Sequence, residues 1–240
     1  AFEGAYTVPA DTIMIDSEAF MNCVRLTGII LPSGSSIRLG DRCFKGCTSL
    51  ERVELRGDIP QWGEETFMEC TSLKKLDIGV SSQENVSRVG TRAFKGCTGL
   101  VGRESVAFRA SMPILGEECF AECVNLEAVP MSERARLSIE TIERKAFSGC
   151  KSLAQFITSA FRGVKTIDAY AFSDCDSLAN PSIPASVTWI GEGLFSECEN
   201  IQTVSFYCVL EEYPKDCFKN CPKLKRTGGV AGALSGLKKI

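Results

Sequence analysis

Cysteine is the residue type with the most chemical potential in this sequence, because 13 thiols stand among 240 residues. Thiolates act as nucleophiles and as metal ligands, and three pairs of cysteines have a spacing that zinc sites use. No histidine is present, which removes Ser-His and Cys-His nucleophile activation and every histidine-containing metal site. The three pairs are Cys43 and Cys47, Cys119 and Cys123, and Cys217 and Cys221.

Carboxylates offer a second route to chemistry. Glu54, Asp77 and Glu104 are predicted to take the same outward position in three successive strands, where neighbours lie about 5 Å apart. Carboxylates at that separation raise one another's pKa or hold a cation. A solvated acidic stripe, partly neutralised by Arg52 and Lys75, is the simpler interpretation. Because the sequence contains no phosphate-binding glycine loop and no triad order, we expect neither an enzyme nor a cofactor.

The elements that must position these residues come from one phrase that occurs nine times: a phenylalanine, a cysteine three residues later, and a leucine or isoleucine three residues after that. The phenylalanines are 23 to 27 residues apart, which is the period of a solenoid. The phrase predicts a short helical turn, and the apolar–polar alternation after the leucine predicts a strand with one buried face. The nine phenylalanines are Phe20, Phe44, Phe67, Phe94, Phe120, Phe147, Phe172, Phe195 and Phe218.

A single repeat cannot bury its apolar face, so we expect the repeats to stack, with parallel strands and an internal column of phenylalanines. Nine cysteines fall in the repeat position and three directly before a phenylalanine, which leaves Cys208 outside both positions. Buried cysteine behaves as a small apolar group, so we expect an internal ladder of reduced thiols. The zinc-spaced pairs would lie roughly 14 to 19 Å apart at one strand spacing per repeat, too far to share a metal. We therefore expect no metal site.

Residues 190–201, which read Ile-Gly-Glu-Gly-Leu-Phe-Ser-Glu-Cys-Glu-Asn-Ile, resemble the BspA-like class of leucine-rich repeat. Residues 183–190 supply the strand end and loop that this class carries before its Gly-x-x-Ala-Phe phrase. The resemblance covers residues 15–226. It implies an α/β fold, a right-handed leucine-rich-repeat solenoid with one short parallel strand and one short helical turn per repeat. It also implies a binding scaffold, often on the surfaces of bacteria and parasitic protists, and it transfers no catalytic residue.

Residues 1–226 are predicted to form a single solenoid of about nine full repeats plus a degenerate N-terminal one, in which Ala5 takes the cysteine position. Residues 227–240 have lost the phenylalanine and the cysteine and are predicted to form a degenerate C-terminal cap or a linker. Because terminal repeats need a capping surface, we expect residue 1 to be a processing point, a fragment boundary or a contact with another molecule.

Charge and hydropathy narrow the classes of partner. The net charge is -3 with 24% charged residues, which gives no reason to expect nucleic acid. No apolar run approaches the roughly 20 residues that cross a bilayer, so no membrane span is expected. Asn85, in the longest insertion, begins an Asn-Val-Ser sequon and is a candidate for glycosylation.

Four successive repeats lengthen the distance from the leucine to the next phenylalanine from 17 residues to between 19 and 21. The extra residues are predicted to lie between strand and turn, where stacking would align them into one ridge that binds a partner. Arginine and aromatic residues, which are enriched at interface hot spots, recur there. The alternative is that the phenylalanines fold under their own loops and the arginines are only solvated. The predicted binding residues are Phe108, Arg109, Arg134, Arg136, Phe161 and Arg162.

Two functions are consistent with these patterns. The first is a non-catalytic protein–protein interaction module, which recognises a protein partner through its solenoid surface as a cell-surface or secreted recognition or adhesion protein. The resemblance favours this function. The second is an intracellular structural or scaffold subunit of a large protein assembly, which the open end at Ala1 and the many thiols favour.

Overall fold

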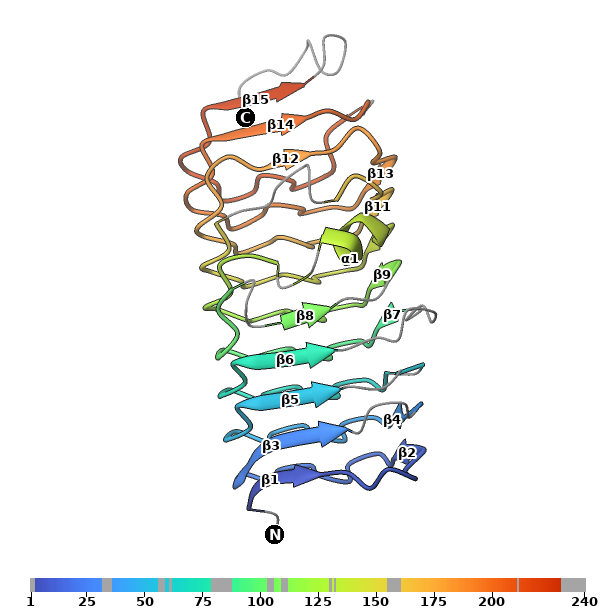
Figure 1. Cartoon of the computed structure of the whole chain (residues 1–240). Helices are drawn as coiled ribbons and strands as arrows, with labels where there is room; N and C mark the ends of the chain where they lie inside the picture. Colours follow the sequence, from blue (N-terminus) through green and yellow to red (C-terminus); the bar gives the residue numbers. More distant parts are fainter. Residues whose placement is uncertain are drawn as a thin grey trace.

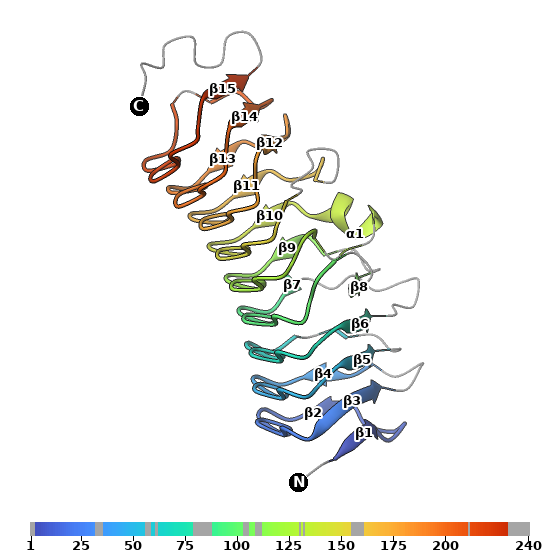
Figure 2. The same ribbon diagram turned by 90° about the vertical axis from the view of Figure 1, so that its left-hand side faces the viewer.

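The chain winds into an elongated stack of coils that begins with the N-terminal coil at one end and finishes with the C-terminal coils at the other (Figure 1). Seen from the side, the stack bends along its length (Figure 2). The fold is a parallel β-solenoid with little helix. The computed structural model describes residues 3–31, 36–55, 59–60, 62–78, 88–102, 106–108, 112–129, 131, 133–154, 161–210 and 212–229.

Two rows of short strands run along the stack, and all their pairings are parallel (Figures 1 and 2). The first row holds the sheets β1-β3-β5-β6-β8 and β12-β14-β15, and the second row holds β2-β4 and β7-β9-β10-β11-β13. The first-row strands are β1 (Gly4–Thr7), β3 (Leu26–Leu31), β5 (Arg52–Leu55), β6 (Lys75–Ile78), β8 (Val106–Phe108), β12 (Ser182–Ile183), β14 (Thr203–Phe206) and β15 (Arg226–Gly229). The second-row strands are β2 (Met14–Ile15), β4 (Arg38–Leu39), β7 (Arg88–Val89), β9 (Ile114–Leu115), β10 (Thr141–Ile142), β11 (Thr166–Ile167) and β13 (Trp189–Ile190).

The core is a column of phenylalanine rings along the axis of the stack. Rings of consecutive repeats lie with their centroids 5.1 to 6.2 Å apart, from the Phe20–Phe44 pair to the Phe195–Phe218 pair. All nine phenylalanines that define the repeat are buried. The predicted internal column is therefore confirmed, and each ring gives the next repeat an apolar surface to pack on.

The predicted helical turn around each phenylalanine is wrong. On either side of Phe44, Arg42 and Gly46 have positive φ angles of 55° and 71°, which a right-handed helix does not contain. The backbone hydrogen bonds also alternate in direction. The N–H of Phe44 donates to Thr66 of the next repeat over 2.9 Å, whereas the N–H of Cys47 donates back to Phe44 within its own turn. Every second amide thus joins two coils, whereas a continuous helix would satisfy those amides within one coil.

Eight repeat cysteines, of which Cys221 is half-buried and the others are buried, form the expected ladder. Each of eight repeat cysteines donates its thiol to the carbonyl oxygen of the preceding repeat's phenylalanine over 2.9 to 3.2 Å. Burial raises the pKa of Cys47 to about 11 and that of Cys123 to about 12, so these thiols keep the proton that they donate. The donors are Cys47, Cys70, Cys97, Cys123, Cys150, Cys175, Cys198 and Cys221.

The predicted stripe of outward carboxylates is also wrong. Glu54 pairs with Asp77 in register, but Asp77 pairs with Ala107. Asp77 lies four residues after Leu73 (77 − 73), whereas Ala107 lies seven residues after Leu100 (107 − 100), so Ala107 takes the position in the register that was predicted for Glu104, which itself lies outside the described residues. Glu54 is only 3% exposed and forms an ion pair with Arg52. Within the described ranges, no three cysteine, aspartate or glutamate side chains are grouped as metal ligands. No helix in these ranges is long and apolar enough to cross a membrane.

Candidate partner-binding surface

The described residues contain one α-helix, α1 (Glu133–Ser138), which lies in an insertion of the middle repeats. It lies just before β10 and projects from the stack on the side where the first-row strands β6 and β8 lie (Figure 2). Ala135 and Ile139 are buried against the core, whereas Leu137 is 44% exposed. The helix thus fixes an apolar side chain at the surface of the coil.

Three successive coils make the same turn just before β10, β11 and β13. In each, an N–H donates to the carbonyl three residues earlier: Ile139 to Arg136, Val164 to Phe161, and Val187 to Pro184, over 3.4, 3.2 and 3.2 Å. The donor residue of every turn is a buried aliphatic residue, which anchors the turn to the core. The second residue of each turn is exposed, which makes a row of tips. The tips are Leu137, Arg162 and Ala185.

Adjacent turns are in close backbone contact. A β-carbon built on Gly163 would lie 2.8 Å from the carbonyl oxygen of Leu137, so only glycine fits there without movement of the backbone. Below this contact, Phe161 is 1% exposed and packs in the core. The end of α1 and the Arg162 turn therefore form one continuous surface.

The strands that follow these turns extend the surface. Thr141, Thr166 and Trp189 are in register in β10, β11 and β13, and their neighbours Ile142, Ile167 and Ile190 are buried. Trp189 is 50% exposed, so half of a large aromatic side chain meets solvent. Between the tips and the strands, Lys165 donates to Glu140 over 2.9 Å. We call the exposed side chains Leu137, Arg162, Lys165 and Trp189 the partner surface.

Several arginines of the described ranges form ion pairs, whereas others, including Arg38 and Arg144, form none there. Arg42, Arg88 and Arg92 form ion pairs with glutamates at 2.8, 2.8 and 3.1 Å. In the same described ranges, Arg136 and Arg162 take part in no ion pair, and the buried Nε of Arg136 has no hydrogen-bond acceptor. Among the described residues, the exposed Arg162 therefore has no carboxylate partner, whereas Lys165 is paired with Glu140.

The predicted binding residues have different positions in the structure. Arg162 is exposed and Arg136 half-buried, and the contact between Gly163 and Leu137 brings their two turns together. Phe161 is buried and does not offer its ring to a partner. Phe108 lies in β8 and Arg134 in α1, with side chains outside the described part. Arg109 and Asn85 both lie outside the described residues.

Sequence reasoning missed Leu137 and Trp189. Trp189 had one available signal: it directly precedes Ile190, the apolar residue five positions before a repeat phenylalanine. Side chains alternate across a strand, so this tryptophan had to face away from the core. Leu137 gave no comparable signal, because its exposure depends on how α1 sits on the neighbouring turn.

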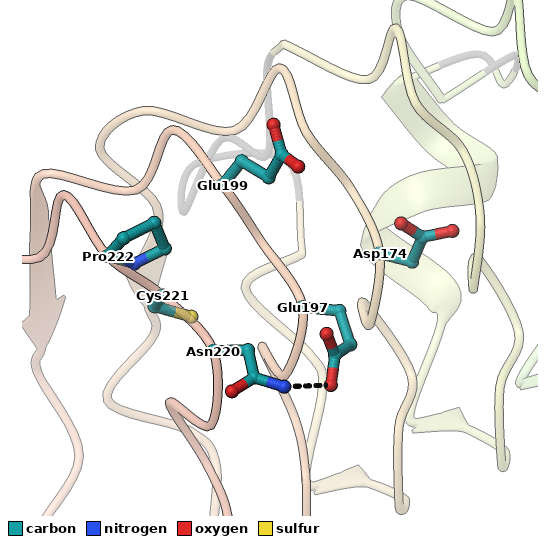
Figure 3. A pocket seen from close by; sticks show the side chains of 6 residues that line it. All are labelled: Asp174, Glu197, Glu199, Asn220, Cys221 and Pro222. Atoms are coloured by element: carbon teal, nitrogen blue, oxygen red, sulfur yellow. Dashed lines mark hydrogen bonds between the residues drawn. The ribbon is translucent and has the colours of Figure 1, made fainter.

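A second surface feature is a hollow in the C-terminal coils (Figure 3). It lies on the side of the stack that carries the turns around the repeat phenylalanines, which we call the tight-turn side. Two of the acidic side chains that line this hollow, those of Asp174 and Glu197, have hydrogen-bond partners in neighbouring coils. Asp174 accepts from Lys151 over 2.7 Å, and Glu197 accepts from Asn220 over 2.7 Å. These bonds join neighbouring coils, so we interpret the hollow as part of the scaffold. It is lined by Asp174, Glu197, Glu199, Asn220, Cys221 and Pro222.

Three solved structures share this fold. A leucine-rich repeat protein from Bacteroides ovatus is 23% identical with a TM-score of 0.62, over 94% of this chain and 63% of that one. The T. pallidum leucine rich repeat protein is 21% identical with a TM-score of 0.52, over 82% and 77%. A leucine rich cell surface protein from Faecalibacterium prausnitzii is 18% identical with a TM-score of 0.51, over 100% and 92%. At these identities the likeness extends to the fold alone.

The chain thus spans 63% of the length of the B. ovatus structure. Curated proteins give no match. The family model for the BspA type leucine rich repeat region (6 copies) matches residues 5–127, 79–159 and 114–228. Together these segments cover the phenylalanine column and the cysteine ladder. The chain belongs to the BspA-type leucine-rich repeat family.

Proposed function

We propose that this chain is a non-catalytic protein–protein interaction module that recognises a protein partner through the partner surface. In this proposal, residues 1–226 are one right-handed solenoid of about nine full repeats plus a degenerate N-terminal one, and residues 227–240 are a cap or a linker. The rigid stack of coils holds the surface in place, which lowers the entropy that binding costs.

The observation that carries the proposal is an exposed leucine whose turn contacts the turn of Arg162, which forms no ion pair within the described residues, and an exposed tryptophan in the row of strands that follows these turns. Tryptophan and arginine are the residue types most often found at the centre of binding energy in interfaces. We propose that Arg109, Arg134 and Phe108 also contribute to partner binding, whereas Phe161 packs in the core. Aligned insertions on one side of a solenoid are a usual location for a binding face.

The setting that the family favours is the cell surface. One of the similar structures is described as a leucine rich cell surface protein, and we propose the same setting for this chain, as a secreted or surface-bound recognition or adhesion protein. A glycan on Asn85 is part of this proposal for a eukaryotic source.

The cysteine ladder favours a second candidate function. Its eight thiols must stay reduced to donate their hydrogen bonds, a state that a reducing compartment maintains without help from burial. In this alternative the chain is an intracellular structural subunit of a large protein assembly.

Cross-linking of the native protein in its source tests both candidates. Lys165 belongs to the partner surface, and Lys151 lies on the tight-turn side, so these two lysines serve as reporter and control. A partner cross-linked at Lys165 and not at Lys151 is the expected result. Partners cross-linked on several sides of the stack would favour the assembly subunit. A native protein that cross-links to nothing at Lys165 would remove the partner surface from consideration.

A further inference from the structure

Two cysteines of the ladder are accessible to solvent. Cys23 in the first described coil and Cys221 in the last described turn are half-buried, whereas the other 11 cysteines are buried. Cys221 is already engaged, because its thiol donates to the carbonyl oxygen of Phe195 over 2.9 Å, and it lines the acidic hollow (Figure 3). The thiol of Cys23 makes no hydrogen bond with any described residue. Cys23 is therefore the thiol that a small oxidant in solution reaches most easily.

Cys47 lies directly beside Cys23 in the next coil. The backbone N–H of Cys23 and the thiol of Cys47 donate to the same atom, the carbonyl oxygen of Phe20, over 3.1 and 3.0 Å. Two groups that contact one oxygen lie close to each other, so the sulfur of Cys47 stands next to the backbone of Cys23. Cys47 itself is buried, and burial raises its pKa to about 11, so Cys23 and not Cys47 reacts first with an oxidant.

The spacing of the two coils suits a disulfide. The N–H of Asn22, next to Cys23, donates to the carbonyl of Lys45 in the next coil over 2.8 Å, and the N–H of Phe20 donates to the same coil. Such bonds hold neighbouring coils about 5 Å apart, inside the range of roughly 4.4 to 6.8 Å that separates the α-carbons of a disulfide. The β-carbons must come slightly closer, to roughly 3.5 to 4.5 Å, and a bond strained in this way is easily reduced again.

We propose that Cys23 and Cys47 form a reversible disulfide when the protein meets a peroxide, and that this bond ties the first two described coils together. The thiolate of Cys23 attacks hydrogen peroxide, becomes a sulfenic acid and releases hydroxide, which takes up the proton that Cys23 has lost. The thiol of Cys47 then attacks the sulfur of the sulfenic acid. The S–S bond forms, and the hydroxyl leaves as water with the proton of Cys47.

In total the two thiols lose two hydrogens and two electrons, and hydrogen peroxide is reduced to two waters. The bond also removes the hydrogen bond from Cys47 to Phe20, so a reducing agent restores both the thiols and that contact. This inference goes beyond the proposed function, because it does not involve the partner surface and applies to both candidate functions.

Mass spectrometry of the oxidised full chain tests the bond. The reduced protein is treated with hydrogen peroxide, the remaining thiols are blocked with iodoacetamide in denaturant, and the peptides are mapped without reduction. We expect one linked pair of peptides, which contain Cys23 and Cys47 and separate when dithiothreitol is added. Cys97 and Cys123, which are neighbours in the ladder but fully buried, are expected to remain thiols.

Three variants identify the roles of the two thiols. Cys23→Ser should abolish the linked pair, and it should fold, since the thiol of Cys23 makes no hydrogen bond with the described residues. Cys47→Ser should leave Cys23 as a sulfenic acid, which dimedone traps. Cys70→Ser is the matched control and should keep the linked pair. Circular dichroism before oxidation establishes which variants are folded, and if Cys47→Ser is not, the natural sequence and Cys23→Ser still decide.

Three results would overturn the inference. The first is a Cys23 that is oxidised in the natural sequence while Cys47 stays a thiol. The second is a disulfide between the Cys23 residues of two chains, which would make this cysteine an intermolecular contact. The third is equal linkage of Cys97 with Cys123, which would mean that exposure does not select the pair.

Discussion

The thiol of Cys97 donates a hydrogen bond to the carbonyl oxygen of Phe67, 3.0 Å away in the preceding repeat. The same oxygen accepts the backbone N–H of Cys70 over 3.2 Å. The thiol thus satisfies the second lone pair of a buried carbonyl and joins two coils at the same time. This relationship explains why the repeat position holds cysteine and not an apolar residue of similar size.

Cys97→Ala should lower the free energy of unfolding by about 2 kcal/mol, because it removes a buried hydrogen bond and leaves a small cavity. Cys119→Ala is the matched control. Cys119 is equally buried, but it occupies the position that Ala93 and Ala146 fill in other repeats, so its loss should cost less than about 1 kcal/mol. Urea unfolding measures both, and equal losses would show that the thiol contributes only its volume.

The chain should lose stability steeply in alkaline solution. Burial raises the pKa of Cys70, Cys97 and Cys150 well above the ordinary value, whereas the unfolded thiols ionise at about pH 8.5. Folding therefore favours the protonated form. The stability is complete below the unfolded pKa and is lost as the pH rises towards the folded pKa, by about 1.4 kcal/mol per thiol and pH unit.

Urea unfolding between pH 7 and pH 10 with a reducing agent measures this alkaline slope. A variant in which Cys43, Cys119 and Cys217 are replaced by alanine is expected to show a shallower slope, since it has three fewer buried thiols. A slope that is identical in the variant would contradict the explanation.

Glu65 joins three coils through its carboxylate. It accepts from Lys45 over 2.8 Å and pairs with Arg92 at 3.1 Å, and its side chain is 15% exposed. The hydrogen bond from Lys45, against the opposing effect of burial, lowers the pKa of Glu65, with the charges of Lys45 and Arg92 adding to the effect. The stability from this lowered pKa is present above the unfolded value of about 4.3 and is lost as the pH falls through the folded value.

Glu65→Gln should therefore destabilise the chain by about 1 kcal/mol at neutral pH, and the difference from the natural sequence should vanish in acid as Glu65 takes up its proton. Glu51→Gln serves as the control, because the Glu51–Lys74 pair is 3.4 Å long and exposed. Thermal unfolding at several pH values decides the matter: a difference that persists in acid would mean that the charge of Glu65 is not responsible.

Gly90 lies where two coils come closest. A β-carbon on Gly90 would stand 2.3 Å from the carbonyl oxygen of Gly63 in the preceding coil. Gly90→Ala should cost about 3 kcal/mol of stability, because backbone and not a flexible side chain has to move. Gly102→Ala should change little, since nothing lies within 4 Å of its β-carbon position. Equal effects in circular dichroism melts would mean that the coils can separate at low cost.

Much of the fold could be predicted from the sequence, because every repeat packs its phenylalanine and its cysteine in the same way. The column of phenylalanines and the ladder of thiols follow from the fixed distance between Phe and Cys, since every coil places these residues at the same point. The turn around Phe44 could not be predicted in the same way. Its apolar spacing suits a helix, but the left-handed residues Arg42 and Gly46 direct alternate amides to the next coil.

The candidate site shows the same division. The sequence located the insertions and the arginines in them, because lengthened repeats and residue types are visible along the chain. It could not establish that Phe161 is buried while Leu137 is exposed, nor that Trp189 is in register with Thr166. Those facts depend on which turn packs on which neighbour.

By itself, the sequence determined a stack of similar coils, the residues inside it and the absence of histidine chemistry, because these follow from a period and from composition. Only the tertiary structure decided which surface residues stand together. Arg136, Arg162 and Trp189 belong to three different coils, and the offset between coils depends on backbone contacts such as that of Gly163 with Leu137. The period of the sequence determines which residues recur in every coil. The positions of the irregular insertions, which distinguish one surface from another, depend on packing between the coils.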